Sequence, residues 1–124
     1  MMTIEILKEE FSVCKIPDIS QVDLSDEFYF LAKTDEELSL VCHHTSVPSN
    51  AFTCENGWRA FRIGGVLDFS LIGILSKIAS LLSENQISIF AISTYNTDYI
   101  LVKNKDFNQA ITILKNNQYE IKTL

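Results

Sequence analysis

The residues best suited to chemistry lie in two short segments of the second half of the chain. The first, residues 65–70, contains Asp68 and Ser70 just before a strongly periodic apolar stretch. Backbone N–H groups at a helix start, together with the helix dipole, favour a bound carboxylate. The second segment offers Asp98 just past a turn and the hydroxyl of Ser93, which suit an ammonium group. Together the two segments predict a site for a small zwitterion.

Both segments also have a plain structural interpretation. Asp68 or Ser70 could simply cap the following helix. Asp98 could be an ordinary turn residue, and Ser93 could face solvent. Residue types and spacing alone leave these alternatives open.

The residue types and their spacing give little support to a catalytic site or a metal site. His43 and His44 are adjacent on a predicted strand, so their side chains point to opposite faces and do not share one ion. The chain has three cysteines, Cys14, Cys42 and Cys54. They are spread too far apart for a disulfide framework or a metal-ligand pattern, and nothing marks one as an activated nucleophile. No dinucleotide or phosphate-loop fingerprint is present. We therefore predict no catalytic residues, no metal site and no cofactor.

Two helices and several short strands must position the candidate residues. Apolar side chains three and four apart predict helices over residues 69–84 and 106–117, with Asp106 capping the second. Alternating apolar residues between polar, proline and glycine breaks predict strands. These strands cover residues 10–16, 28–33, 38–43, 58–64, 87–94, 99–103 and 119–122. The second half thus reads strand, helix, strand, strand, helix, strand, and the first half repeats this plan with reduced helices.

Composition and charge narrow the class of protein. The 124 residues are 47% hydrophobic, which is typical of a globular domain. The formal net charge of −6 disfavours nucleic acid and anionic membrane surfaces as partners. No apolar run is long enough to span a membrane, and the N-terminus becomes charged too early for a secretory signal. We therefore predict a cytoplasmic protein.

Long stretches of the chain resemble the ACT domain family of small regulatory modules. The likeness rests on GVLDFSLIGILSKIASLLSENQISIFAISTYNTDYILV and, in the first half, on EFSVCKI and KTDEELSLVCHHTSVP. It is closer to bacterial tandem-ACT proteins related to the cytosolic arginine sensor of animals and to the aspartate kinase regulatory region. The resemblance implies an α+β fold of two ACT-like, ferredoxin-type βαββαβ units, with antiparallel sheets and helices on one face. Residues 1–57 would form a reduced N-terminal unit, and residues 58–124 a C-terminal ACT domain.

The resemblance also implies a function and a site. Members of the family usually bind an amino acid where the loop after the first strand meets the following helix, often at a dimer interface. The chain is therefore expected to be a non-catalytic, homodimeric regulator that binds a free amino acid or related metabolite and has an unidentified protein partner. The matching positions are Gly64, Gly65, Val66, Leu67, Asp68, Phe69, Ser70, Ile92, Ser93, Thr94, Tyr95, Thr97 and Asp98.

Two other hypotheses stay open at the level of the sequence. The first is a ligand-free interaction or dimerisation module, since Ile72 stands where many relatives of the family have Thr or Ala. The second is an enzyme that uses a cysteine. Stabilisation by one or a few free amino acids would separate a sensor from an interaction module.

Overall fold

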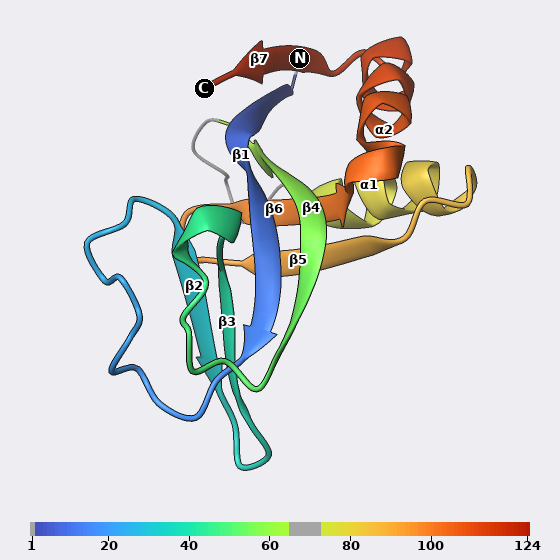
Figure 1. Cartoon of the computed structure of the whole chain (residues 1–124). Coiled ribbons are helices and arrows are strands. Elements are labelled where there is room, and N and C mark those ends of the chain that lie inside the picture. Colours follow the sequence, from blue (N-terminus) through green and yellow to red (C-terminus); the bar gives the residue numbers. More distant parts are fainter. Residues whose placement is uncertain (1, 65–72) are drawn as a thin grey trace. The chain divides into compact units, whose positions relative to one another are not determined.

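The computed structural model describes residues 2–64 and 73–124, which belong to two compact units (Figure 1). We call Glu9–Trp58 the N-terminal unit, and Met1–Lys8 together with Arg59–Leu124 the C-terminal unit. The strands β1 (Thr3–Lys15) and β4 (Thr53–Ile63) contribute residues to both. The first eight residues thus group with Arg59–Leu124 and not with the segment that follows them. The division into a unit of residues 1–57 and a domain of residues 58–124 stays a prediction.

The C-terminal unit is a sheet of strand order β7-β1-β4-β6-β5 with two helices packed on it. The strands β5 (Ile89–Ser93) and β6 (Asp98–Lys103) form an antiparallel hairpin. The helices α1 (Ile74–Ser83) and α2 (Asn104–Asn116) place apolar stripes against the sheet. The core combines alternate strand residues with these stripes, among them Ile4, Ile6, Phe61, Ile63, Ile100, Val102, Ile78, Leu82, Phe107, Ala110 and Leu114.

The first strand is longer than the sequence predicted. It begins at Thr3 and not near residue 10, because Ile4 and Ile6 alternate onto the buried face of the sheet. The closing strand β7 (Glu120–Thr123) pairs with residues Thr3 to Ile6, and this pairing is parallel. The expectation of a purely antiparallel sheet is therefore wrong at β7.

The first helix begins later than the sequence predicted. Its N-cap is Gly73, with φ of 84°, and its first residue is Ile74, not residue 69. A positive φ is easy for glycine and costly for other residues, so the chain turns into the helix at this glycine. The predicted cap residues Asp68 and Ser70 lie outside the described part of the chain.

The second helix is close to its predicted range. It runs from Asn104, with Lys103 as the N-cap residue, so Asp106 does not cap it. Asp106 lies in the first turn, where its negative charge still favours the positive end of the helix dipole. No helix among residues 2–64 and 73–124 is both long and apolar enough to cross a membrane.

The N-terminal unit is a sheet of strand order β2-β3-β1-β4 without a long helix. The strand β3 (Leu38–His43) pairs antiparallel with β2 (Tyr29–Lys33) and with the end of β1. Residues 16–28 form turns and bends, and a three-residue 3-10 helix, η1 (His44–Ser46), follows β3. A small core fills one face of this sheet: Cys14, Ile16, Leu40 and Cys42.

The two units repeat the same hairpin at a spacing of sixty residues. Tyr29 and Ile89 begin five-residue strands. Leu38 and Asp98 begin six-residue strands that share one burial pattern, in which three consecutive buried residues follow two partly buried ones. The short η1 follows the first hairpin where α2 follows the second. The plan of one complete and one reduced ACT-like half stays a prediction.

Equivalent backbone hydrogen bonds close the turns of the two hairpins. The N–H of Thr34 donates to the carbonyl of Glu37, and the N–H of Thr94 donates to the carbonyl of Thr97, both at 2.9 Å. In each turn the threonine hydroxyl accepts a further backbone N–H. The repeat therefore extends from strand lengths to turn chemistry.

Candidate functional site

The glycine that ends β4 is engaged within the sheet. The N–H of Gly64 donates to the carbonyl of Thr3 at 2.7 Å. A Cβ at Gly64 would lie 3.0 Å from Cγ and from Cδ of Glu5. Because Gly64 has no Cβ, the Glu5 side chain can approach its backbone closely.

The loop half of the predicted site is outside the described part of the chain. It comprises Gly65, Val66, Leu67, Asp68, Phe69 and Ser70. The described chain stops at Gly64 and resumes at Gly73, the N-cap of α1. These two glycines mark where the segment leaves β4 and where it meets α1.

The hairpin half of the predicted site is fixed beside the end of β4. Thr97 is only 8% exposed, and its hydroxyl donates to the carbonyl of Ile63 at 2.6 Å. The hydroxyl of Thr94 donates in turn to the carbonyl of Thr97 at 2.9 Å. These bonds bring the β5–β6 turn next to Ile63, the residue before Gly64.

Asp98 presents a half-buried carboxylate at the start of β6. It stands directly opposite Ser93 in the antiparallel pairing, and the Ser93 hydroxyl donates to its Oδ1 at 2.5 Å. Ile92 is half-buried, whereas Tyr95 at the turn is 90% exposed. A carboxylate held by a cross-strand hydroxyl is a suitable acceptor for an ammonium group.

The polar pair of Ser93 and Asp98 belongs to one hairpin only. Sixty residues earlier, the equivalent positions on β2 and β3 are Lys33 and Leu38, which also face each other. The N-terminal hairpin therefore lacks both the carboxylate and the hydroxyl. If the chain has one hairpin site for a cation, the side chains favour the C-terminal unit.

An ion pair that the sequence pattern did not single out lies next to Gly64. Arg62 Nε donates to Glu5 Oε1 at 2.8 Å, and Arg62 Nη1 donates to the hydroxyl of Tyr99 at 3.2 Å. The side chains of Arg62 and Glu5 are 27% and 19% exposed. The hydrogen bond to Glu5 raises the pKa of Arg62 above its ordinary value. One feature of the sequence could have pointed to this ion pair. In each of the two strands a charged residue, Glu5 or Arg62, stands between two apolar neighbours.

A cleft of about 350 Å³ lies at the start of α1. Gly73, Ile74 and Lys77 line it from the helix side, and residues 117–119 line it from the segment before β7. None of the described residues predicted to bind a ligand lines this cleft. The cleft adjoins Gly73, where the described chain resumes after Gly64.

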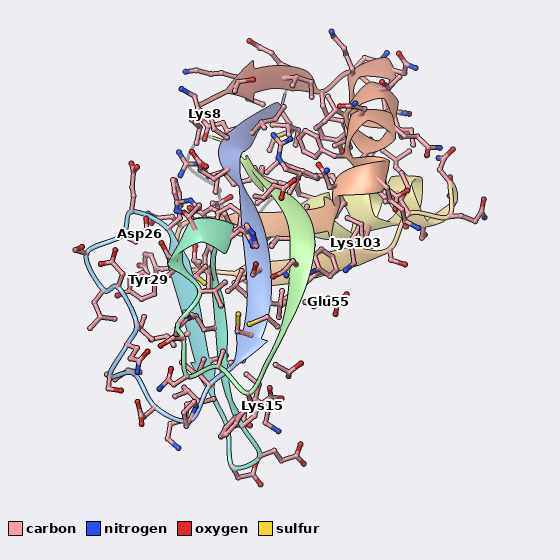
Figure 2. All side chains as sticks on the ribbon, in the orientation of Figure 1. Lys8, Lys15, Asp26, Tyr29, Glu55 and Lys103 are labelled. Carbon is pink, nitrogen blue, oxygen red and sulfur yellow. The ribbon has the colours of Figure 1, made fainter. Side chains whose placement is uncertain are left out.

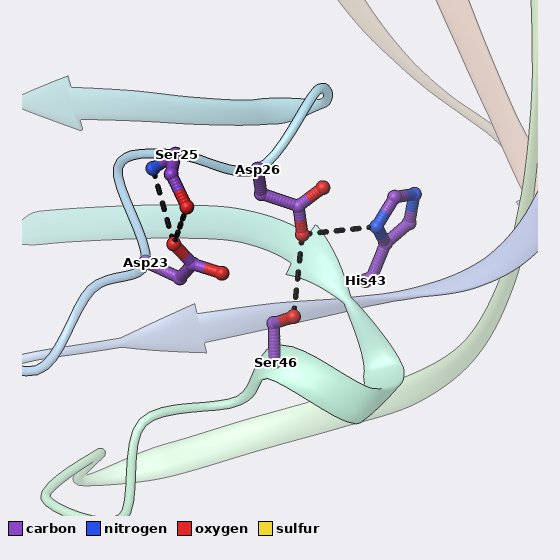
Figure 3. Close-up of polar contacts among 5 residues, drawn as sticks. All are labelled: Asp23, Ser25, Asp26, His43 and Ser46. Atoms are coloured by element: carbon purple, nitrogen blue, oxygen red, sulfur yellow. Dashed lines mark hydrogen bonds and ion pairs between the residues drawn. The ribbon is translucent and has the colours of Figure 1, made fainter.

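The N-terminal unit contains a second polar cluster, shown in Figure 3. Asp26 Oδ2 is 3.0 Å from His43 Nδ1 and accepts a hydrogen bond of 3.2 Å from the Ser46 hydroxyl. The His43 ring also packs against Phe11, with centroids 4.8 Å apart. Burial opposes ionisation of Asp26, but the hydrogen bond and charge of His43 outweigh it and lower the pKa of Asp26. The cluster fastens the segment before β2 to the end of β3.

The two adjacent histidines have separate partners. His44 Nδ1 is 3.2 Å from the hydroxyl of Ser12, which donates to Asn56 Oδ1 at 2.7 Å. His43 contacts Asp26 instead. In the described part of the chain, no three His, Cys, Asp or Glu side chains are grouped so that they could hold a metal ion.

Comparison with known sequences finds a domain family and partial relatives. The family model of the ACT domain matches residues 53–116. The cytosolic arginine sensor for mTORC1 subunit 1 of Homo sapiens is 40% identical over 62 residues, which are 49% of this chain and 19% of that protein. The Mus musculus protein of the same name is 42% identical over the same length. The matched stretch thus spans about a fifth of these curated relatives.

Solved structures resemble the chain over nearly its full length. Protein Atu0741 of Agobacterium tumefaciens has a TM-score of 0.88 at 27% identity, covering 99% of this chain and 93% of that one. The aspartate kinase of Clostridium acetobutylicum, described as an allosteric enzyme, has a TM-score of 0.68 at 16% identity. That match covers 91% of this chain and 34% of the kinase, and at this identity it shows the fold alone.

Proposed function

Because this chain belongs to the ACT domain family, we propose that it is a regulatory module that binds a free amino acid or a related small metabolite. The observation that carries the proposal is the polar pair of Asp98 and Ser93. Only the C-terminal hairpin has this pair, and Thr97 fixes the hairpin beside the end of β4. Amino-acid ligands carry an ammonium group, and the half-buried carboxylate of Asp98 supports the proposal because it could pair with that group.

The proposed ligand spans the two segments that the sequence singled out. Its ammonium group pairs with Asp98 and the neighbouring carbonyls of residues 92–95. Its carboxylate is held by main-chain N–H groups of residues 65–69, which lie between Gly64 and Gly73 in the chain. The sequence of residues 65–70 and the flanking glycines, Gly64 and Gly73, support this second contact.

The size of the ligand sets the expected affinity. An amino acid has roughly ten heavy atoms, so a Kd between micromolar and sub-millimolar values is realistic. Such a Kd suits sensing of a metabolite whose concentration changes. Regulation further requires that the ligand prefer one conformation of the protein, whose altered surface a partner protein reads.

We extend the proposal to the whole chain. The sixty-residue repeat of hairpins supports a tandem arrangement in which the N-terminal unit is an ACT-like unit with reduced helices. The module is proposed to act in the cytoplasm as a non-catalytic homodimer. Sedimentation velocity tests the assembly, because a monomer at micromolar concentration would contradict it.

A ligand-free interaction module is the second candidate. The observation that favours it is the hydrogen bond from Ser93, which already satisfies one oxygen of Asp98. In that case the carboxylate is a structural part of the hairpin. The two candidates predict different effects of removing the negative charge of Asp98. In a sensor the change weakens ligand binding, whereas in an interaction module it changes only the stability of the hairpin.

Thermal unfolding in the presence of each of the twenty amino acids separates these candidates. A ligand at a hundred times its Kd stabilises the folded chain by about 2.7 kcal/mol. For a chain of this size that raises Tm by roughly 10 °C. Asp98→Asn should remove the increase, because it keeps an acceptor for Ser93 but loses the charge.

The matched control is Asp35→Asn in the turn of the other hairpin. Asp35 is exposed and its substitution changes the net charge by the same amount as Asp98→Asn. The control should keep the ligand-induced increase in Tm. A wild-type chain that no amino acid stabilises, or an increase in Tm that survives Asp98→Asn, would contradict the proposal.

A further inference from the structure

Two cysteines distant in sequence are neighbours in the N-terminal unit. Cys14 on β1 and Cys54 on β4 lie 40 positions apart in the chain, and their Sγ atoms are 2.8 Å apart. Both are free thiols. A disulfide bond is about 2.05 Å long, so the two sulfurs need to approach by only roughly 0.8 Å to form one.

The pair is open to a small reagent. Cys14 and Cys54 both line an open cleft of about 450 Å³, and Cys54 is half-buried whereas Cys14 is only 2% exposed. The third cysteine, Cys42, is buried on β3 and does not line this cleft. A molecule that enters the cleft therefore meets Cys54 first.

Charged side chains form part of the lining of the cleft. Lys15, Glu37 and Glu55 line it, giving two carboxylates and one ammonium group. Lys15 and Glu55 are labelled in Figure 2, which draws sulfur atoms in yellow. This lining and the net charge of −6 favour a cationic reagent over an anionic one.

We propose that Cys14 and Cys54 form a reactive dithiol that small, preferably cationic, disulfide molecules oxidise to an intramolecular disulfide. This site lies in the N-terminal unit and is independent of the amino-acid site proposed for the C-terminal unit. Neither the family nor the sequence spacing points to it. It rests on the distance between the two sulfurs and on the cleft that exposes them.

The reaction proceeds in two exchange steps. The sulfur of Cys54 attacks one sulfur of the small disulfide, forms a mixed disulfide and releases one small thiol, which takes the Cys54 proton. The sulfur of Cys14 then attacks the sulfur of Cys54 and displaces the second small thiol, which takes the Cys14 proton. The two protein thiols are oxidised, and one small disulfide is reduced to two thiols.

The surroundings of the thiols assign these roles. Burial, followed by the hydrogen bond to Cys54, raises the pKa of Cys14. Burial also raises the pKa of Cys42 to about 11. Cys14 is therefore protonated at neutral pH and is a poor nucleophile toward a free reagent, so the first attack falls to Cys54. The second step is intramolecular: the adjacent sulfurs of Cys14 and Cys54 bond while the Cys14 proton passes to the departing small thiol.

The direct test treats the full reduced chain with cystamine, a small cationic disulfide, and follows intact mass and peptide maps after alkylation. The expected product has lost two hydrogens, contains a cross-linked peptide pair with Cys14 and Cys54, and keeps an alkylatable Cys42. A persistent cystamine adduct, a cross-link that includes Cys42, or an unreacted chain would each overturn the proposal. This measurement needs no variant, so it does not depend on how substitutions affect folding.

Three variants assign the roles within the pair. Cys14→Ser should stop at a stable cystamine adduct on Cys54, because the second step is lost. Cys54→Ser should abolish intramolecular disulfide formation, and Cys42→Ser, the matched control, should form the disulfide as the wild-type chain does. Disulfide formation in Cys54→Ser, or its loss in a folded Cys42→Ser, would refute the assignment.

Discussion

Replacing Gly64 by alanine should weaken the fold through one specific neighbour, Glu5. The added Cβ would lie 3.0 Å from two carbons of the Glu5 side chain, which is too close for ordinary contact. Glu5 must therefore shift, and its Oε1 loses ideal geometry with Arg62 Nε, now at 2.8 Å. The φ of Gly64 is not positive, so the backbone itself accepts alanine.

The expected free-energy change follows from two opposing effects. A charged hydrogen bond is worth about 1.5–3 kcal/mol when well buried and an exposed ion pair about 0–1 kcal/mol. The Arg62 and Glu5 side chains are 27% and 19% exposed, so disrupting the pair should cost about 1–2 kcal/mol. Alanine in place of glycine stabilises by about 0.4–1 kcal/mol through the unfolded state. The net loss for Gly64→Ala should be about 1 kcal/mol.

The sign of the effect should reverse when Glu5 is removed first. In a Glu5→Ala background the clash and the ion pair are both absent, so Gly64→Ala should stabilise by about 0.4–1 kcal/mol. Urea unfolding followed by circular dichroism measures all four chains of this cycle. The control is Gly57→Ala, whose φ of 82° makes alanine costly although no atom lies near the added Cβ. Gly57→Ala should lower the free energy of unfolding by the same amount with and without Glu5. If Gly64→Ala also costs the same in both backgrounds, Glu5 is not the neighbour that opposes the substitution.

Two further substitutions test how each unit is held together. Thr97→Val should cost about 1–3 kcal/mol, because it leaves the Ile63 carbonyl without its 2.6 Å donor, whereas the exposed Thr94→Val should cost under about 0.5 kcal/mol. Asp26→Asn should lower the free energy of unfolding near neutral pH and flatten its decline in acid. The folded-state pKa of Asp26 is lowered beside His43, so its stabilisation is present above the ordinary carboxyl pKa of about 4 and is lost as pH falls through the lowered value.

Urea titrations measure both effects, the second as a series from about pH 7 to pH 3. Equal losses for the two threonine variants would show that the buried bond to Ile63 does not anchor the hairpin. Parallel pH curves for wild type and Asp26→Asn would show that the contact in Figure 3 contributes no acid-sensitive stability.

The sequence predicted the elements whose pattern is local. Polar turn residues 94–97 separate two apolar strand segments in the sequence, and the structure pairs Ser93 with Asp98 across this turn. Helix α2 starts within two residues of its predicted position. The start of α1 was missed by five residues, because apolar periodicity continues before Gly73 and does not reveal the positive φ of that glycine.

Contacts between distant residues were beyond the reach of local patterns. Arg62 and Glu5 are 57 positions apart, and Cys14 and Cys54 are 40 apart. Both pairs depend on which strands become neighbours, and the first part of β1, from Thr3 to Glu9, was not predicted as strand. Thr97 was predicted as a ligand-binding residue, but its hydroxyl joins the hairpin to β4.

The most direct test of an amino-acid site at the β5–β6 hairpin is a titration of the isotope-labelled chain followed by NMR. The titrant is the amino acid that raises Tm most. We predict saturable shifts in the amide resonances of residues 93–98, which disappear in Asp98→Asn and persist in Asp35→Asn. Saturable shifts confined to residues 9–58, or shifts at the hairpin that survive Asp98→Asn unchanged, would contradict the account.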